Sequence, residues 1–143
     1  KQQKIVVIGN GMVGHHFVEQ LVTSGANTHI TVLGEEPRPA YDRVHLSDVF
    51  GGSEPEDLAM GDRETYAAWG VDAHFGEPVA TIDRDNKVVV TSLERRFDYD
   101  TLVMATGSYP FVPPIEGAEG DSRLVYRTLA DLDTIQAAAK AAR

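Results

Sequence analysis

Three glycines near the N-terminus have the spacing of a phosphate-binding turn. Gly9, Gly11 and Gly14 satisfy the pattern G-x-G-x-x-G within the stretch KIVVIGNGMVGHHFVEQL. In such a turn the first glycine bends the chain off a strand, the second lets a pyrophosphate approach the backbone, and the third lets helix and strand pack closely. The anion meets the N–H groups and the positive dipole end of the helix. We therefore predict a dinucleotide site, with Met12 and Val13 beside the glycines.

An acidic residue follows the glycines at the distance that a ribose-binding carboxylate requires. Glu35 lies 21 positions after Gly14 (35 − 14), and the expected separation in this motif is about 20. A carboxylate there accepts hydrogen bonds from the ribose hydroxyls. Together with its neighbour Glu36 it would repel a 2′-phosphate, which disfavours NADP. NAD and FAD both stay open, because they carry the same adenosine ribose.

A strand, a helix and a second strand are needed to hold this turn. The β-branched run Lys4–Ile8 is typical of a strand that is buried on both faces, and His29–Leu33 predicts a second one. Between them, Ser24-Gly25 predicts the end of a helix. The apolar residues at helical spacing are Val13, Phe17, Val18, Leu21 and Val22. The three elements form a β-α-β unit with parallel strands.

The rest of the chain predicts shorter elements. Pro37 and Pro39 favour a loop through Ser47, and Ser53 with Glu56 reads as a capping box at a helix start. The further predicted elements are a helix at Asp62–Trp69, a strand at 71–75, a hairpin around Asp85-Asn86, a possible strand at Arg96–Tyr99, a strand at Thr101–Gly107, and an alanine-rich helix with Thr128 as N-cap and Asp131 at N3. We expect an α/β, Rossmann-like fold: a parallel sheet with flanking helices and a small antiparallel excursion at 79–99.

Composition restricts the function classes. The chain has 143 residues, enough for a globular domain with a core, and 42% of them are hydrophobic. Its formal charge of −9 argues against nucleic acid or an acidic membrane as a partner. No apolar run reaches the roughly 18 residues of a membrane span, so the cytoplasm is the expected compartment. Without cysteine the chain itself holds no disulfide, zinc–thiolate site or iron–sulfur cluster.

A second stretch, LVMATGSYPFVPP (Leu102–Pro114), distinguishes between NAD and FAD. Its strand end at Ala105, Thr106 and Gly107, followed by prolines, resembles the second flavin signature of flavoprotein reductases that have two dinucleotide-binding domains. This resemblance implies that the chain passes close to FAD there. FGEPVATIDRDNKVV resembles the segment whose backbone reads the adenine, near Val79. EEPRPAYDRVHLS resembles the loop in which an arginine, here Arg43, reaches the flavin side.

The particular residues in these motifs indicate which family of flavoprotein reductases the chain resembles. AYDRVHLSD, GNGMVGHHF and ATGSYPFVPPIEG are similar to the N-terminal part of the large subunit of assimilatory NAD(P)H nitrite reductases. Ferredoxin and rubredoxin reductases usually carry a proline pair in this loop and end it in LSK, where this chain has Val44, His45 and Asp48. The family resemblance implies that NAD(P)H reduces FAD, and that electrons pass through an iron–sulfur cluster to a sirohaem that reduces nitrite to ammonia.

The same resemblance implies a division of the polypeptide. Residues 1–115 would form the first segment of an FAD-binding domain, and 116–143 a connecting segment and helix leading to an NAD-binding domain. The cluster and the sirohaem need cysteines from regions outside this chain. We therefore expect a piece of a longer enzyme, inactive alone, with the NAD-binding and sirohaem domains of the same polypeptide and a possible small subunit as partners.

No catalytic side chain and no metal ligand is expected in this chain. Neither a Ser–His–Asp set nor paired carboxylates can be identified, and flavin itself carries the hydride and electron chemistry. His15 and His16 are expected to face solvent, because no partner has ligand spacing. His45 is expected to be a loop residue without chemistry. Trp69 and Phe75 are expected in the core.

Several alternatives stay open. Arg43 could be an exposed arginine that pairs with Asp42 or Asp48 instead of contacting flavin. The chain could be the FAD module of a nitrate reductase electron-transfer subunit or of a ferredoxin or rubredoxin reductase. A hypothesis from a different functional class is that the chain is a non-enzymatic module that senses NAD. Cysteine clusters beyond residue 143 would favour nitrite reductase, and flavin absorption bands would exclude NAD as the resident ligand.

Overall fold

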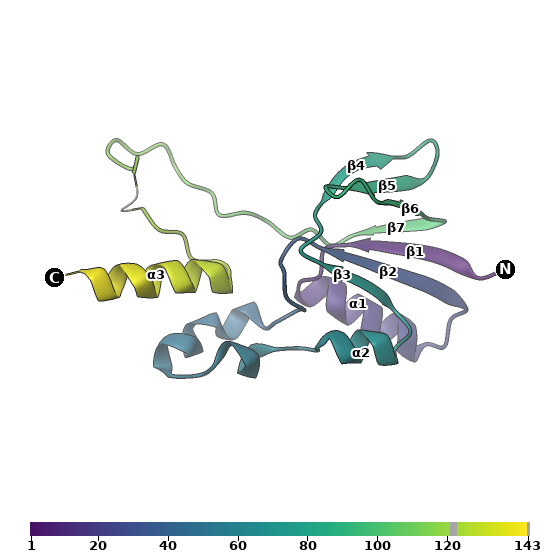
Figure 1. Ribbon diagram of the computed structural model, residues 1–143, viewed down its shortest axis with the longest axis horizontal. Coiled ribbons are helices and arrows are strands. Elements are labelled where there is room, and N and C mark those ends of the chain that lie inside the picture. The colour runs from purple at the N-terminus through teal and green to yellow at the C-terminus, as the bar shows by residue number, and fades with distance from the viewer. Residues whose placement is uncertain (121–122, 143) are drawn as a thin grey trace. The chain divides into compact units, whose positions relative to one another are not determined.

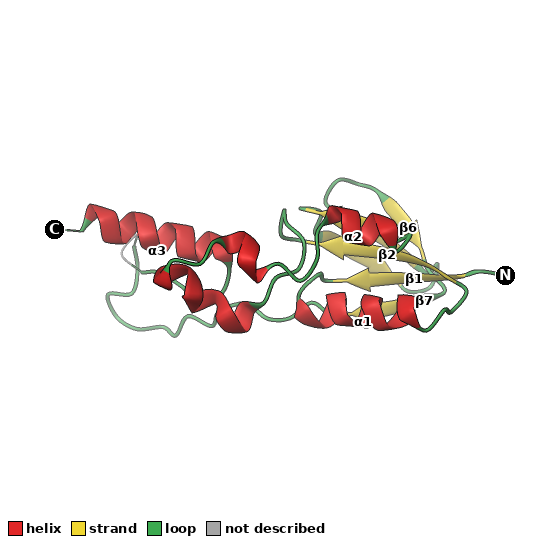
Figure 2. Ribbon diagram, turned by 90° about the horizontal axis from the view of Figure 1, so that it is seen from below, coloured by secondary structure: helices red, strands yellow, loops and turns green. Residues whose placement is uncertain are grey.

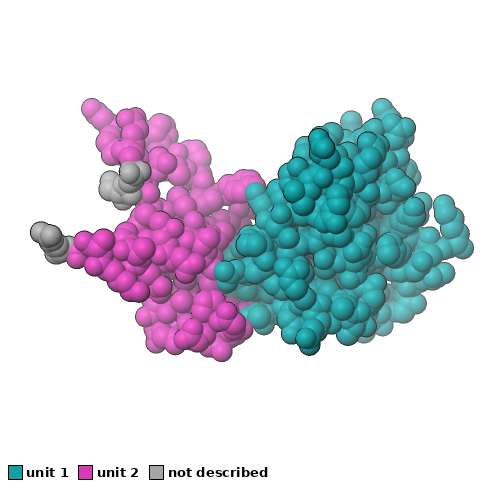
Figure 3. All heavy atoms as spheres, in the orientation of Figure 1, with its two compact units in different colours: residues 1–42, 59–107 teal, residues 43–58, 108–143 magenta. Residues whose placement is uncertain are grey.

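A computed structural model describes residues 1–120 and 123–142 of the chain. Contacts within the chain define two compact units, coloured in Figure 3. Unit 1 consists of residues 1–42 and 59–107, and unit 2 of residues 43–58 and the described residues from 108 onward. These units describe packing, whereas the predicted division between residues 115 and 116 concerns cofactor binding. That division stays a prediction.

A four-stranded parallel sheet is the centre of unit 1 (Figure 1). The strand order is β3-β2-β1-β7, with β1 at Gln3–Ile8, β2 at Thr28–Gly34, β3 at Asp72–Phe75 and β7 at Thr101–Met104. Ile8 at the end of β1 pairs with Leu33 on one side and with Met104 on the other. The predicted parallel pairing of the first two strands is therefore confirmed.

Two helices cover one face of this sheet. α1 (Met12–Thr23) and α2 (Arg63–Ala68) lie together on one side of the strands in Figure 1. In Figure 2, which is the view from that side, both helices lie in front of the strands. Ile5 and Val7 of β1 face the helices, where they pack with Val18 of α1 and Tyr66 of α2. Trp69 and Phe75 pack against the same cluster, as predicted.

The opposite face is covered by a three-stranded antiparallel sheet (Figure 1). Its strands are β4 at Val79–Asp83, β5 at Val88–Thr91 and β6 at Arg96–Asp98. Val6 and Ile8 alternate with the helix-facing residues of β1 and pack with Val89 of β5. Because both faces of β1 are covered, its continuous apolar run is required. The predicted antiparallel excursion is confirmed.

Local signals fix the helix ends of unit 1. α1 ends at Thr23, and Gly25 adopts a φ of +68°, which glycine adopts without strain. α2 begins after Asp62, whose carboxylate accepts a hydrogen bond from the backbone N–H of Thr65 at 2.7 Å. The Thr65 hydroxyl in turn accepts from the Asp62 N–H at 3.2 Å. This capping box satisfies backbone donors that the first helical turn leaves unpaired.

Unit 2 contains short helical segments and one long helix. A 3-10 segment with a kink at His45 spans Arg43–Gly51, a second spans Pro55–Leu58, and α3 spans Leu129–Ala141. The Thr128–Asp131 capping box of α3 is present as predicted. None of the helices among the described residues has the length and apolar character to cross a membrane.

Two local predictions in this region were wrong. The loop predicted through Ser47 becomes helical at Arg43, because residues 40–51 contain no proline to prevent it and the apolar side chain of Leu46 is buried. The predicted capping box of Ser53 with Glu56 does not form, and a backbone-to-side-chain hydrogen bond one position later takes its place. The backbone N–H of Glu54 donates to the Asp57 carboxylate at 2.9 Å.

A buried carboxylate ties the antiparallel sheet to the segment before it. Glu77 is 1% exposed, and its Oε1 accepts from Thr91 Oγ1 at 2.8 Å and from Arg95 Nε at 2.7 Å. The second carboxylate oxygen also contacts the guanidinium of Arg95. The hydrogen bonds from Arg95 lower the pKa of Glu77 and outweigh the opposing effect of burial.

We expect Glu77→Gln to destabilise unit 1 by about 1.5–3 kcal/mol at pH 7, because charge-assisted hydrogen bonds are lost inside the protein. The folded-state pKa lies below the unfolded one. The stabilisation is therefore complete above the unfolded pKa of about 4.3, and it is lost as pH falls through the folded pKa. Urea unfolding across pH 3–7 measures this difference, with exposed Glu94→Gln as the control. Equal stability of the two variants at pH 7 would contradict it.

Candidate dinucleotide-binding site

The glycine turn lies at the carboxyl end of β1, between the ends of its two neighbours. The backbone N–H of Gly9 donates to the carbonyl of Leu33 on β2 at 2.9 Å. On the other side, the N–H of Ala105 donates to the carbonyl of Ile8 at 2.8 Å. After β1 the chain continues to β2, which lies on one side of β1, while the later strand β7 lies on the other side. Parallel sheets bind ligands at such a reversal of strand order.

The first and third glycines are required by the fold itself. Gly9 has a φ of +103°, and a Cβ atom there would lie 2.1 Å from the carbonyl oxygen of Ala105. A Cβ atom on Gly14 would lie 2.2 Å from the carbonyl oxygen of Gly9. Both contacts are with backbone, which cannot move aside as a flexible side chain can. These two positions bring β1, α1 and the end of β7 into close contact.

The second glycine is different, because the fold leaves space beside it. A Cβ atom on Gly11 would meet no atom within 4 Å, and its φ of −88° suits any L-residue. Gly11 is the N-cap of α1 and makes no side-chain cap hydrogen bond, and the first turn holds no acidic residue. The backbone at Met12 and Val13 is thus not capped by a side chain. This cradle fits the pyrophosphate of a dinucleotide, which would occupy the space and bind at the helix end.

The predicted acids follow β2 at the same edge of the sheet. Glu35 comes directly after the last residue of β2 and is exposed. Glu36 is half-buried, and its Oε2 accepts a hydrogen bond from the hydroxyl of Tyr41 at 2.7 Å. Since β2 pairs with β1 up to Leu33, the structure brings these carboxylates to the edge that carries the glycine turn.

The second predicted contact region begins where β7 ends. The strand stops at Met104, three residues earlier than predicted, and Ala105 is the residue against which Gly9 packs. Thr106 and Gly107 follow and are exposed, and Gly107 has a φ of +65°. The two glycine-containing segments, far apart in the sequence, therefore meet in unit 1.

Two residues predicted from resemblance lie elsewhere in the fold. Val79 is the first residue of β4, and the register of the pairing with β5 shifts between Val79 and Thr81. It packs against the cluster on the antiparallel side of the parallel sheet. Arg43 belongs to unit 2, where its Nη1 donates to the backbone carbonyl of Arg127 at 3.0 Å. The roles of both side chains at a cofactor stay predictions.

A row of hydrogen-bonded side chains that the sequence did not predict is attached to the glycine turn. The Tyr66 hydroxyl donates to Asn10 Oδ1 at 2.7 Å and lies 2.6 Å from His15 Nδ1. The expectation that His15 faces solvent was wrong, since it is 3% exposed. Burial lowers the pKa of His15, and it raises the pKa of Tyr66 to about 12. No local pattern reveals these contacts, because 51 residues separate His15 from Tyr66.

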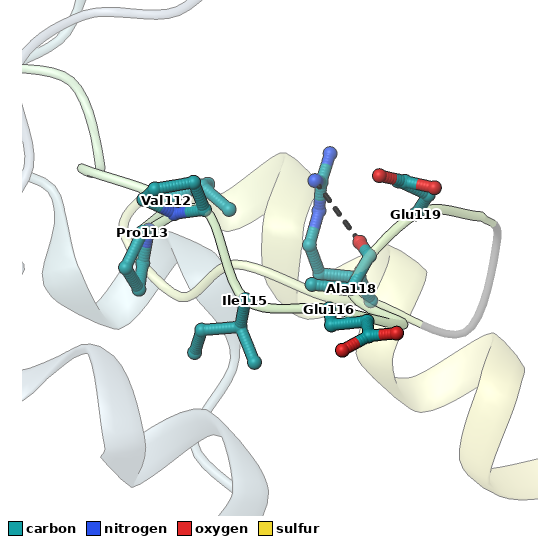
Figure 4. Close-up of a pocket in the computed structure, with 8 residues that line it drawn as sticks. Val112, Pro113, Ile115, Glu116, Ala118 and Glu119 are labelled. Carbon is teal, nitrogen blue, oxygen red and sulfur yellow. Dashed lines mark hydrogen bonds between the residues drawn. The ribbon is translucent and has the colours of Figure 1, made fainter.

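Unit 2 has an open surface pocket of its own (Figure 4). Its lining residues include Val112, Pro113, Ile115 and Glu116, and Arg123 donates to the carbonyl of Ala118 at 3.1 Å. None of the predicted cofactor residues lines it. Among the described residues, no group of three or more His, Cys, Asp or Glu side chains is placed to hold a metal ion.

A parallel sheet with a glycine turn at its strand reversal defines a Rossmann-like dinucleotide-binding protein. The family model described as pyridine nucleotide-disulphide oxidoreductase matches residues 3–143. The chain belongs to this family of oxidoreductases.

Relatives within the family are consistent with the resemblance seen in the motifs. The chain is 46% identical over 139 residues to the large subunit of nitrite reductase (NADH) of Escherichia coli, covering 96% of this chain. It is 35% identical to the assimilatory nitrate reductase electron transfer subunit of Bacillus subtilis, over 94% of this chain. It spans only 16% and 18% of these two proteins.

Solved structures confirm the fold class. The reductase in a covalent putidaredoxin reductase–putidaredoxin complex superposes with a TM-score of 0.85 at 28% sequence identity. The match covers 95% of this chain and 34% of that one. The predicted Rossmann-like architecture is therefore confirmed, and the similarity again involves one part of a larger protein.

Proposed function

We propose that this chain is the first FAD-binding segment of an NAD(P)H-dependent nitrite reductase large subunit. The main support for a nucleotide site is a contrast within the glycine turn. A Cβ atom on Gly9 or Gly14 would collide with backbone atoms, whereas a Cβ atom on Gly11 would point into open space. The nitrite reductase assignment rests on the 46% identity to the Escherichia coli subunit. In this proposal the chain is part of a longer enzyme, the full-length protein.

Each part of the site has a defined task in this proposal. The turn at Gly9–Gly14 and the first turn of α1 bind the pyrophosphate, and Glu35 binds the adenosine ribose. Thr106 and Gly107 border the cofactor where the chain leaves β7, Val79 contacts the adenine through its backbone, and Arg43 reaches the flavin side. When bound, FAD would supply the hydride and electron chemistry, and these residues would hold it in position and exclude competing reactions.

Glu35→Ala should weaken FAD binding by the full-length protein without abolishing it. The variant loses charge-assisted hydrogen bonds to the ribose, which contribute roughly 1.5–3 kcal/mol. Because Glu35 is exposed and follows the strand, its removal should leave the fold unchanged. Titration of the apoprotein with FAD, followed by flavin fluorescence, measures the loss. The exposed Glu64→Ala, on α2, is the control, and equal affinity of the two variants would remove Glu35 from the site.

A second candidate function is electron transfer to nitrate reductase or to an iron–sulfur protein. It is favoured by the 35% identity to the Bacillus subtilis subunit and by the likeness to putidaredoxin reductase. The deciding experiment supplies the full-length protein with NADH under anaerobic conditions and offers nitrite or an oxidised ferredoxin as acceptor. We expect consumption of nitrite with formation of ammonia. Reduction of the ferredoxin without loss of nitrite would favour the second candidate.

The isolated chain should neither oxidise NADH rapidly nor reduce nitrite. It contains a single G-x-G-x-x-G motif and no cysteine for a cluster, so the nicotinamide site and the acceptor centres would come from elsewhere in the full-length protein. Anaerobic addition of NADH to the purified chain with FAD, followed by flavin absorbance, tests this expectation. Stoichiometric bleaching faster than that of free FAD would show a complete hydride-transfer site within these 143 residues.

A further inference from the structure

Two successive backbone N–H groups hold the segment that carries the predicted ribose acid. The N–H of Gly76 donates to the carbonyl of Glu36, and the N–H of Glu77 donates to the carbonyl of Gly34, each at 2.8 Å. Glu35 lies between these two acceptors, directly after β2. The carbonyl of Gly34 belongs to the planar peptide that joins it to Glu35, so this bond fixes the plane from which Glu35 begins. The direction of the Glu35 side chain therefore depends on residues 76 and 77.

The side chain of Glu77 is fixed by residues of β5 and of the turn before β6. Its buried carboxylate accepts from Thr91 of β5, and both of its oxygens accept from the guanidinium of Arg95, which directly precedes β6. Arg95 is itself held in place, because its Nη2 donates to His74 Nδ1 at 2.9 Å and its guanidinium lies 5.9 Å from the centre of the Phe97 ring. A guanidinium only donates hydrogen bonds, so the His74 nitrogen accepts. The Glu77 carboxylate thus has one orientation.

Stability alone does not explain a charged pair at this position. Burying a carboxylate costs free energy, and replacing a buried ion pair with apolar side chains of similar volume is often neutral or stabilising. The contribution of the pair is directional: Arg95 fixes the side chain of Glu77, and the N–H of the same residue holds the carbonyl beside Glu35. Glu77 therefore connects the antiparallel sheet to the end of β2 through both its side chain and its backbone.

We infer that Glu77 is a positioning residue for the ribose-binding carboxylate. Held by Arg95 and Thr91, it keeps the backbone at residues 34–36 in the conformation that directs Glu35 to the adenosine ribose. In this role Glu77 acts through Glu35 and does not contact the cofactor. The inference rests on the proposed function, and it assigns an effect on cofactor binding to a buried residue outside the glycine turn.

The test measures the dissociation constant of FAD for Glu77→Gln in the full-length protein. Both oxygens of the Glu77 carboxylate accept from Arg95, so either orientation of a glutamine amide places its NH2 group against an Arg95 donor. The side chain must then move, and the backbone bond to Gly34 shifts with it. We expect about tenfold weaker FAD binding from the displaced Glu35. Glu94→Gln, the same change at an exposed glutamate of unit 1, should leave the affinity unchanged.

Two comparisons show whether the effect passes through Glu35. In a Glu35→Ala background, Glu77→Gln should cause no further loss of FAD affinity, because the side chain that it positions is absent. An FAD analogue without the adenosine 2′-hydroxyl lacks the donor that the carboxylate binds, so Glu77→Gln and the parent should bind this analogue almost equally. A merely structural role would instead weaken binding of FAD and of the analogue by the same factor.

Thr91→Val supplies a second variant if Glu77→Gln does not fold, which thermal unfolding of each apoprotein reveals. It keeps the branched shape of the side chain and removes the hydroxyl that donates to Glu77. We expect a smaller loss of FAD affinity, of about threefold, which again disappears in the Glu35→Ala background. Thr81→Val, at an exposed position of β4, is the matched control and should bind FAD like the parent.

The outcomes separate this inference from the proposed function. If Glu35→Ala weakens FAD binding while Glu77→Gln and Thr91→Val bind FAD like the parent, the positioning role is wrong and the FAD site stands. Losses from Glu77→Gln and Glu35→Ala that simply add would also overturn the positioning role. If Glu35→Ala itself has no effect, the ribose role of Glu35 and this inference both fail. If the parent protein holds no FAD, the proposed function fails and this inference fails with it.

Discussion

Gly11→Val will abolish FAD binding by the full-length protein while leaving its fold intact. A Cβ atom at position 11 meets nothing within 4 Å, and the φ of −88° is favourable for valine. The protein alone therefore tolerates the side chain. A bound pyrophosphate does not, because the branched side chain occupies the space that its oxygens need in order to approach the backbone.

Two measurements on Gly11→Val are needed together. The flavin content of the purified variant gives the loss of binding, and thermal unfolding of the apo forms shows whether the fold is kept. We expect almost no flavin and an unfolding temperature close to that of the parent. A variant that holds FAD as tightly as the parent would show that the phosphate-binding assignment of this turn is wrong.

Gly9→Ala, in contrast to Gly11→Val, will destabilise the fold itself. The φ of +103° and a Cβ–oxygen distance of 2.1 Å to Ala105 mean that β1 or the end of β7 must shift. We expect a loss of at least about 3 kcal/mol in the free energy of unfolding, from backbone strain together with steric overlap. Urea unfolding of the apoprotein measures this loss.

Gly25→Ala is the matched control for Gly9→Ala. Gly25 also has a positive φ, of +68°, but a Cβ atom there would meet nothing within 4 Å. Its replacement should cost about 1–2 kcal/mol from the backbone conformation alone. If both alanine variants lose the same stability, the close approach between Gly9 and the end of β7 does not contribute to it.

The sequence predicted the elements around the glycine turn because their signals are local. The apolar run of β1, the helical spacing in α1 and the Ser24-Gly25 stop all lie within a short stretch of chain. Their parallel arrangement with β2 follows from the length of the connection, which suits a helical crossover. The position of Glu35 at the same edge of the sheet follows from that arrangement.

The features that the sequence did not predict depend on contacts between distant segments. His15 lies on the buried face of α1 because Tyr66 supplies a partner, and only the folded chain brings the two together. Glu77 is buried for the same reason, since its partner Arg95 is 18 residues away. Arg43 and Val79 were identified only by family resemblance, and no spacing rule within the chain marks either residue as a cofactor contact.

The identity of the nucleotide carried by the full-length protein is the most direct test of the FAD site. The protein is purified without added cofactor, denatured, and its released nucleotide is identified by chromatography and absorbance. We expect FAD in stoichiometric amount in the parent and its absence from Gly11→Val. Release of NAD instead of FAD, or failure of the parent apoprotein to take up FAD at saturating concentration, would contradict the assignment of this chain as an FAD-binding segment.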